Sequence, residues 1–211
     1  CADAALYHAK RLGKNRVAAY EVRAVETGSV EAVPVSSRMR ALWQLTEIVD
    51  AVDSDSSGSG HSRRVADLAV DLARQLGVPD DEIELIRLAA RLHDLGKLTV
   101  PVEILGKKGA LADVEWRAVR EHPEIGRRIL TSLGAGEIAD WVLHQHEWWN
   151  GAGHPSGLSG REIPRASRII FVADAFDAMT NDRPFQAALA EDVALHEIIR
   201  CSGTQFDPEV V

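Results

Sequence analysis

The fold of this chain is decided by the segment IELIRLAARLHDLGK, which spans residues 83–97. Its apolar residues recur at helical spacing around most of the circumference, so we predict a central helix. His93 continues the inward face of this helix, and Lys97 lies one turn beyond it. The imidazole of His93 and the adjacent carboxylate of Asp94 are therefore expected in the interior, where both need polar partners.

Helical periodicity also dominates on both sides of this segment. We predict further helices with apolar stripes over residues 39–52, 61–76, 113–122, 125–133, 138–146 and 168–179. The last of these begins with five residues that would also suit a buried strand, but its alanines and its lack of turn signals favour a helix. From residue 37 onward the chain is predicted to be all-α.

The composition limits the partners of this protein. A formal net charge of -8 argues against a protein that binds nucleic-acid backbones, so we expect no DNA partner. No apolar run approaches the roughly 20 residues of a membrane span, and we expect no membrane contact. The two cysteines, Cys1 and Cys201, are too few for a disulfide framework, which favours a cytoplasmic location. Because the sequence starts with cysteine, we interpret it as a fragment of a longer protein.

Histidine and aspartate occur at inward positions on several predicted helices. A single inward histidine is explained more simply by a hydrogen bond to the backbone, but five helical segments that each contribute one such residue favour a metal site. The candidates are His61, His93, Asp94, His122, His146 and Asp174. Nitrogen and oxygen donors without thiolate suit Fe, Mn, Zn, Ni or Co, and an acidic residue can bridge two ions about 3.5–4 Å apart.

The loop at residues 150–164 is weaker evidence. Turn formation explains its Gly-x-Gly pattern without any ligand. The indoles of Trp148 and Trp149 suit packing, with a stacking platform for a base as the alternative. Arg183 is a surface charge by default, or a phosphate-binding residue if it faces the metal ions.

Five segments follow one another along the chain, namely HDLGK (93–97), HPEIG (122–126), HEWWNGAGHP (146–155), DAFDAMTNDRPF (174–185) and GTQFDP (203–208). In this order they resemble the motifs of HD-GYP domains, and the resemblance covers about residues 37–211. It implies an all-α HD-domain helical bundle that hydrolyses cyclic di-GMP through a bi- or trinuclear metal centre, often of iron or manganese.

The resemblance also implies roles for individual residues. The six candidates named above would be the metal ligands, with Asp94 bridging two ions. Asp94 and Lys97 would be catalytic. Substrate contacts would come from Lys97, Arg183, Gly153 and His154.

The chain departs from the family pattern at four positions. Gln145 replaces the first of two paired histidines, and His154 replaces the tyrosine of the GYP motif. Asn150 replaces an aspartate, and Ser57 stands where some members have an acidic residue. We therefore expect two divalent transition metal ions at most, one of them held more weakly.

Residues 1–21 resemble the last helix and strand of a GGDEF diguanylate cyclase domain. We predict that this short α/β remnant is followed by a linker at residues 22–37 and an HD-GYP domain at residues 38–211. The arrangement implies a GGDEF domain as a partner in the same parent chain.

Three functions are open from the sequence. The first is a metal-dependent phosphodiesterase that hydrolyses cyclic di-GMP, or a related cyclic dinucleotide, through a metal-bridged hydroxide. The second is a catalytically weak or inactive regulatory module that binds nucleotide or a GGDEF partner, and the third is an HD phosphohydrolase that acts on another nucleotide. The oligomeric state is open as well, because the stripe at residues 39–52 could pack on the core or form a dimer helix.

Overall fold

The computed structural model describes residues 35–56, 60–107, 109–182 and 187–211, except for the side chains of residues 35, 36 and 52–56. Residues 36–211 form one compact unit. Its elements are α2 (Val35–Ser56), α3 (His61–Gln75), α4 (Asp80–Leu92), η1 (Leu95–Thr99), α5 (Val102–Leu105), α6 (Asp113–Arg120), α7 (His122–Ser132), α8 (Gly136–Leu143), η2 (Gly160–Glu162), α9 (Arg165–Thr180) and α10 (Glu191–Arg200). No strand occurs among these residues, so the all-α prediction is confirmed; the expected remnant at residues 1–21 lies outside them.

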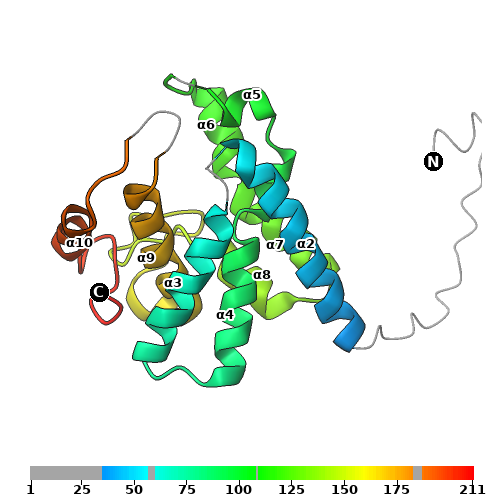
Figure 1. The fold of residues 1–211 in the computed structure, drawn as a ribbon, viewed down its shortest axis with the longest axis horizontal. Coiled ribbons are helices and arrows are strands. Elements are labelled where there is room, and N and C mark those ends of the chain that lie inside the picture. The colour runs from blue at the N-terminus through cyan, green and yellow to red at the C-terminus, as the bar shows by residue number, and fades with distance from the viewer. Residues whose placement is uncertain (1–34, 57–59, 108, 183–186) are drawn as a thin grey trace, which may run out of the picture. The chain divides into compact units, whose positions relative to one another are not determined.

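The core lies where α3, α4, α7, α8 and α9 meet (Figure 1). Helix α3 packs against α4 and α9, while α8 packs against α4 and α7. Val65, Ile86, Leu130 and Ile170 come from four of these helices and are all completely buried. Burial of such side chains is the main favourable contribution to folding, so this contact region holds the site-bearing helices in place.

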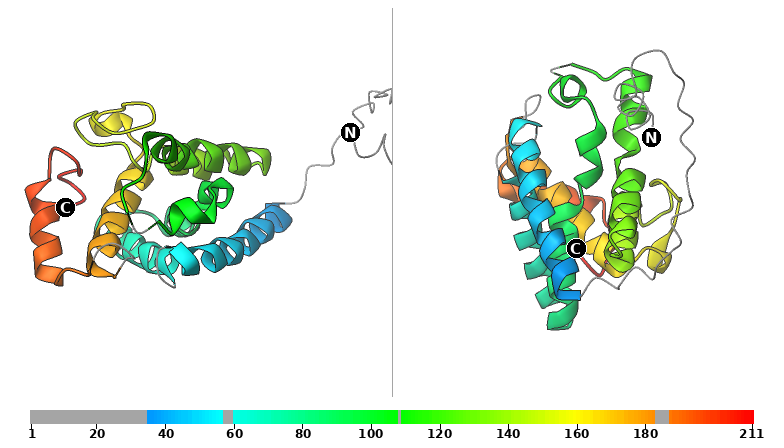
Figure 2. Two further views of the ribbon diagram at one scale, coloured as in Figure 1. Left: turned by 90° about the horizontal axis from the view of Figure 1, so that it is seen from above. Right: turned by 90° about the vertical axis from the view of Figure 1, so that its right-hand side faces the viewer.

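Helices α2 and α10 lie at opposite ends of the bundle (Figures 1 and 2). The apolar stripe of α2 packs on the core, where Leu42 and Val49 are buried. Asp50 of α2 also forms an ion pair with Arg91 of α4, with 2.6 Å between Oδ2 and Nη2. No described helix is both long enough and apolar enough to cross a membrane.

Several helix boundaries differ from the sequence prediction. Helix α4 ends at Leu92, and a short 3₁₀ helix, η1, follows, so Asp94 lies at the junction of two elements and not inside one. Helix α8 ends at Leu143, which places His146 in the loop beyond it. Helix α7 begins at His122, three residues before the predicted start at residue 125. Pro123 therefore lies in its first turn, where an N–H would have no partner within the helix.

Candidate metal and substrate site

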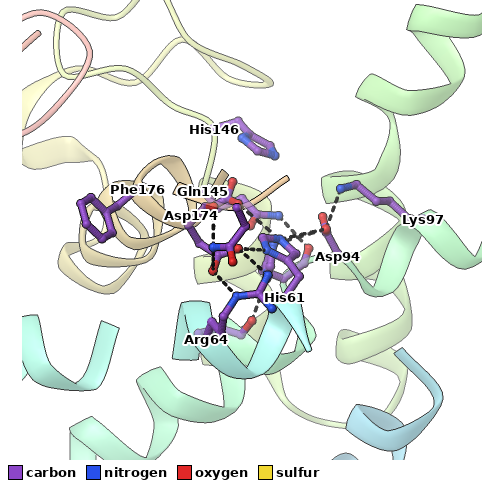
Figure 3. Close-up of polar contacts among 12 residues, drawn as sticks. His61, Arg64, Asp94, Lys97, Gln145, His146, Asp174 and Phe176 are labelled. Atoms are coloured by element: carbon purple, nitrogen blue, oxygen red, sulfur yellow. Dashed lines mark hydrogen bonds and ion pairs between the residues drawn. The ribbon is translucent and has the colours of Figure 1, made fainter. Parts of the chain in front are cut away.

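Asp94 is buried against several imidazoles, and in Figure 3 its carboxylate lies between His61 and Lys97. Its Oδ2 lies 3.3 Å from Nε2 of His93 and 3.9 Å from Nε2 of His61. Its Oδ1 lies 3.5 Å from Nε2 of His122. The two oxygens of one carboxylate therefore face different histidines.

The remaining predicted ligands adjoin this group. Nε2 of His146 lies 3.2 Å from Nε2 of His122, and Oδ1 of Asp174 lies 3.4 Å from Nε2 of His61. The structure thus brings together all six predicted ligands, which we call the His–Asp cluster: His61, His93, Asp94, His122, His146 and Asp174.

Helix ends and close backbone packing assemble the cluster. His61 is the first residue of α3, His122 is the first residue of α7, and Asp94 follows the end of α4. Gly96 lets η1 rest directly on the start of α7, because a Cβ at this position would lie 1.9 Å from the carbonyl oxygen of His122. This contact brings Asp94 beside His122.

Three of the imidazoles are held at Nδ1, which leaves Nε2 directed at the cluster. Nδ1 of His93 lies 2.7 Å from the carbonyl oxygen of Ala90, and Nδ1 of His122 lies 2.7 Å from that of Val119. Nδ1 of His61 lies 2.7 Å from a carboxylate oxygen of Asp177. Such outer partners place the proton on Nδ1 and the lone pair on Nε2, the arrangement found in metal-ligating histidines.

Unsatisfied buried atoms show that the cluster suits a metal ion. Among the described residues, Nε2 of His93 and Oδ1 of Asp94 are buried without a hydrogen-bond partner. Buried polar atoms are normally paired, and a divalent ion would satisfy both. Three ligand atoms, one each from His61, His93 and Asp94, all lie within 4.8 Å of one another, which is close enough to bind one ion.

The charge states within the cluster also favour metal binding. Burial lowers the pKa of His122 to about 4 and that of His146 to about 3, so both are neutral ligands at neutral pH. Burial opposes ionisation of Asp94, but the neighbouring charges of His93 and Lys97 hold its pKa well below the usual range. Burial likewise lowers the pKa of His93, yet Asp94 outweighs this effect and raises it to about 9. An ion bound at His93 would therefore displace a proton.

A second layer of polar residues, which the sequence reasoning missed, holds His61. The carboxylate of Asp177 accepts hydrogen bonds from Nε of Arg64 at 2.5 Å and from Nδ2 of Asn181 at 3.0 Å, besides its contact with His61. Burial would raise the pKa of Asp177, but the hydrogen bonds from His61 and Arg64 keep it below its ordinary value. The only sequence signal for the role of Asp177 was its position as the second aspartate of DAFD, residues 174–177.

Lys97 and Gln145 also contact the cluster. Nζ of Lys97 lies 2.5 Å from Oδ2 of Asp94, and Figure 3 shows the two side chains facing each other, while Phe176 points away. Gln145 is buried, and its Nε2 donates to the carbonyl oxygen of His93 at 2.7 Å. The amide of Gln145 therefore fixes the backbone that carries two predicted ligands.

The glycine-rich loop, residues 144–159 between α8 and η2, places two of the predicted substrate residues beside the cluster. A Cβ at Gly153 would lie 2.2 Å from the backbone nitrogen of Trp148, so only glycine allows this close approach. The backbone N–H of His154 donates to the carbonyl oxygen of His146, and the rings of these two histidines lie 5.2 Å apart. The fourth predicted substrate residue, Arg183, lies outside the described residues.

A cavity of about 660 Å³ opens beside His146. One wall is the loop, with Trp148, Gly153 and His154, and another is α6. The two neighbouring tryptophans have different surroundings, because Trp148 lines the cavity whereas the ring of Trp149 lies 5.7 Å from the guanidinium carbon of Arg168. The volume is within the range of roughly 300–1,000 Å³ that is typical of ligand pockets.

The GTQFDP sequence holds the loop in place. The backbone N–H groups of Trp149 and Asn150 donate to the carbonyl oxygens of Gln205 and Thr204. Asp207 of the same sequence is buried and forms an ion pair with Arg168 of α9. This motif therefore supports the wall of the cavity.

Comparison with known proteins agrees with this geometry. A family model described as HD domain matches residues 47–210. The chain is 37% identical over 175 residues to the "Cyclic di-GMP phosphodiesterase" of Thermotoga maritima, with 81% of this chain and 48% of the relative covered. It is 42% identical over 164 residues to the "3'3'-cGAMP-specific phosphodiesterase 3" of Vibrio cholerae, with 77% and 35% covered.

A solved structure shows the same fold. The HDG"Y"P protein from Bdellovibrio bacteriovorus superposes with a TM-score of 0.62 at 18% identity, over 83% of this chain and 61% of that protein. The chain spans about half the length of the first curated relatives, namely 45% of the "Cyclic di-GMP phosphodiesterase response regulator RpfG" of Xanthomonas campestris and 48% of the Thermotoga protein.

Proposed function

Since this chain belongs to the HD domain family, we propose that it is a metal-dependent phosphodiesterase of the HD-GYP type that hydrolyses cyclic di-GMP or a related cyclic dinucleotide. The observation that carries the proposal is the Asp94 carboxylate, whose two oxygens face His93 and His61 on one side and His122 on the other. The relatives from Thermotoga maritima and Vibrio cholerae, which carry cyclic di-GMP and cGAMP in their names, support this substrate class.

The proposed metal centre holds two divalent transition metal ions. His61, His93, Asp94 and Asp174 would hold the first ion, and Asp94, His122 and His146 would hold the second. The nitrogen and oxygen donors suit Fe or Mn, and Zn, Ni or Co also fit them. When bound, such ions supply a water of lowered pKa and positive charge for the phosphodiester.

The residues around the ions would bind and orient the substrate. Lys97 lies beside Asp94 with its side chain 21% exposed, so its ammonium can reach a phosphate oxygen from the solvent side. Gly153 and His154 line the cavity that begins at His146. Asp177 keeps a proton on Nδ1 of His61 and so holds the Nε2 lone pair toward the cluster. A phosphate contact from Arg183 stays a prediction.

The proposal also covers the setting of the domain. We propose that residues 38–211 act beside a GGDEF domain of the same parent chain, on the basis of the resemblance at residues 1–21. The low cysteine content supports a cytoplasmic location. A homodimer stays a prediction from the sequence, and the stripe of α2 that suggested it packs on the core of this chain through Leu42 and Val49.

Hydrolysis of cyclic di-GMP and of 3'3'-cGAMP, measured on protein loaded anaerobically with Fe(II) or Mn(II), tests the function. Metal content is counted on the same sample. We expect turnover with about two ions per chain. Asp94→Asn should lose both metal and activity, while Asp71→Asn, which removes a carboxylate that is 75% exposed, serves as the matched control. Full metal content and full hydrolysis in Asp94→Asn would show the proposal to be wrong.

A second candidate function is a nucleotide-binding module without turnover. The contact of Gln145 favours it, because the amide nitrogen bonds to the carbonyl oxygen of His93 and no imidazole is present at this position. The same measurements separate the two functions. Binding of cyclic di-GMP without hydrolysis, in protein that holds its metal, would support the module.

A further inference from the structure

Helix α6 presents one regular face to the cavity. Asp113, Trp116, Arg117 and Arg120 line it, at positions i, i+3, i+4 and i+7 of the helix. Residues at this spacing lie on the same side of a helix. None of the residues of α6 is buried, so packing on the core does not account for this face.

Within the part of the chain that the structure describes, the two arginines on this face have no acidic partner. Nε of Arg117 makes a long contact, 3.4 Å, with the backbone carbonyl oxygen of Asp113. Among the described residues, neither Arg117 nor Arg120 forms an ion pair, although most other arginines of the described region do. The cavity wall therefore carries two unpaired guanidinium groups and one carboxylate, Asp113, in a chain whose net charge is -8.

Aromatic surface adjoins these charges. Trp116 of α6 is 52% exposed, and Trp148 of the glycine-rich loop is 37% exposed. Both side chains line the cavity. Exposed indoles beside arginines without an acidic partner suit a nucleotide, since purines stack on such rings and phosphates pair with arginine.

We propose that Arg117 and Arg120 bind the second phosphate of a cyclic dinucleotide, the one that is not cleaved, and that Trp116 and Trp148 hold its neighbouring purine. This inference rests on the proposed function. A cyclic dinucleotide has two phosphates, and when one lies at the His–Asp cluster the other lies farther along the cavity. The cavity extends from His146 to α6, so its far wall is where the second phosphate arrives.

This subsite determines specificity for the size of the substrate. A small phosphodiester, such as bis(p-nitrophenyl) phosphate, has a single phosphate and no purine, so it reaches the cluster without contacting α6. A cyclic dinucleotide uses both ends of the cavity. Loss of the arginines should therefore weaken binding of the dinucleotide far more than it affects the small diester.

The test compares Arg117→Ala/Arg120→Ala with wild type and with Arg127→Ala/Arg128→Ala. The control removes two exposed arginines of α7 that do not line this cavity. Equilibrium dialysis with chelated protein, which cannot turn the ligand over, gives the Kd for cyclic di-GMP. With metal-loaded protein, kcat/KM is measured for cyclic di-GMP and bis(p-nitrophenyl) phosphate. Metal content is counted in all three proteins.

We expect the Arg117→Ala/Arg120→Ala variant to bind cyclic di-GMP roughly 10- to 100-fold more weakly, at unchanged metal content. Its kcat/KM ratio for cyclic di-GMP over the small diester should fall by a similar factor, and Arg117→Lys/Arg120→Lys should recover part of the loss. A Kd and a ratio equal to those of the Arg127→Ala/Arg128→Ala control would overturn this inference alone. Wild-type protein that neither binds nor cleaves a cyclic dinucleotide would overturn the proposed function as well.

Discussion

Replacement of Asp177 by asparagine tests how the second layer of the site supports metal binding. The Asp177 carboxylate is buried, and it contacts His61 at 2.7 Å, Arg64 at 2.5 and 3.1 Å, and Asn181 at 3.0 Å. Asparagine has nearly the same shape but no charge, and one of its two terminal atoms is a donor. The variant therefore cannot accept hydrogen bonds from His61 and Arg64 on both atoms, as the carboxylate does.

The expected loss has two parts. Removal of an outer-layer partner of a ligating histidine costs about 10- to 100-fold in metal affinity, or roughly 1.4 to 2.7 kcal/mol. The free energy of unfolding should fall by about 1–3 kcal/mol for the lost charged hydrogen bonds. The lower end is expected, because the Arg64 side chain is 35% exposed and can turn to solvent.

Competition of Mn(II) between the protein and a chelating dye measures the affinity, and urea unfolding of the chelated protein measures the stability. Asp71→Asn is the matched control, since this aspartate is 75% exposed on α3 and lies outside the cluster. A Mn(II) affinity of Asp177→Asn within about twofold of wild type would refute the reasoning, because it would mean that Nδ1 of His61 needs no carboxylate partner.

Two further outcomes follow from the loop and from the buried histidines. Gly153→Ala should lower the free energy of unfolding by about 1–3 kcal/mol, because its Cβ would lie 2.2 Å from a backbone nitrogen, while Gly136→Ala, with open space around it, should not. Urea titrations compare the two, and equal stability would contradict the expected clash. In chelated protein, the free energy of unfolding should fall below about pH 6.5. There the two histidines take up protons in the unfolded chain, whereas His122 and His146 of the folded protein stay neutral until about pH 4 and 3. It should also fall as the pH rises toward about 9, where His93 loses the proton that the charge of Asp94 favours. A stability curve without a maximum near neutral pH would contradict these shifts.

The sequence was sufficient for the fold class and for the inward positions of two histidines. Helical spacing alone predicts that His61 and His93 point into the core, and both are 1% exposed. Periodicity could not locate the helix ends, and these ends matter here, because Asp94 lies between α4 and η1. At that junction the carboxylate can turn one oxygen toward each group of histidines.

Contacts between distant segments could not be read from the sequence. Arg64 and Asp177 are 113 residues apart, and spacing within a helix carries no information about such a pair. The face of α6 was predicted as part of a helix, but the cavity it lines depends on where the glycine-rich loop folds. The GTQFDP sequence holds the loop through carbonyl groups that accept hydrogen bonds from the backbone N–H groups of Trp149 and Asn150, and nothing in its residue types predicts these contacts.

Two of the departures from the family pattern, Asn150 and Gln145, support the backbone of the site, and Ser57 lies outside the described residues. Oδ1 of Asn150 accepts the backbone N–H of Ala152 at 3.0 Å, a turn contact that aspartate makes equally well. Gln145 is buried and donates to the carbonyl oxygen of His93, so it anchors the ligand-bearing backbone, but its nitrogen has no lone pair for a metal. The proposed ion at His122 and His146 therefore has one imidazole fewer to hold it than the family pattern provides. Whether the domain is a phosphodiesterase or a nucleotide-binding module thus depends mainly on how firmly that second ion is held.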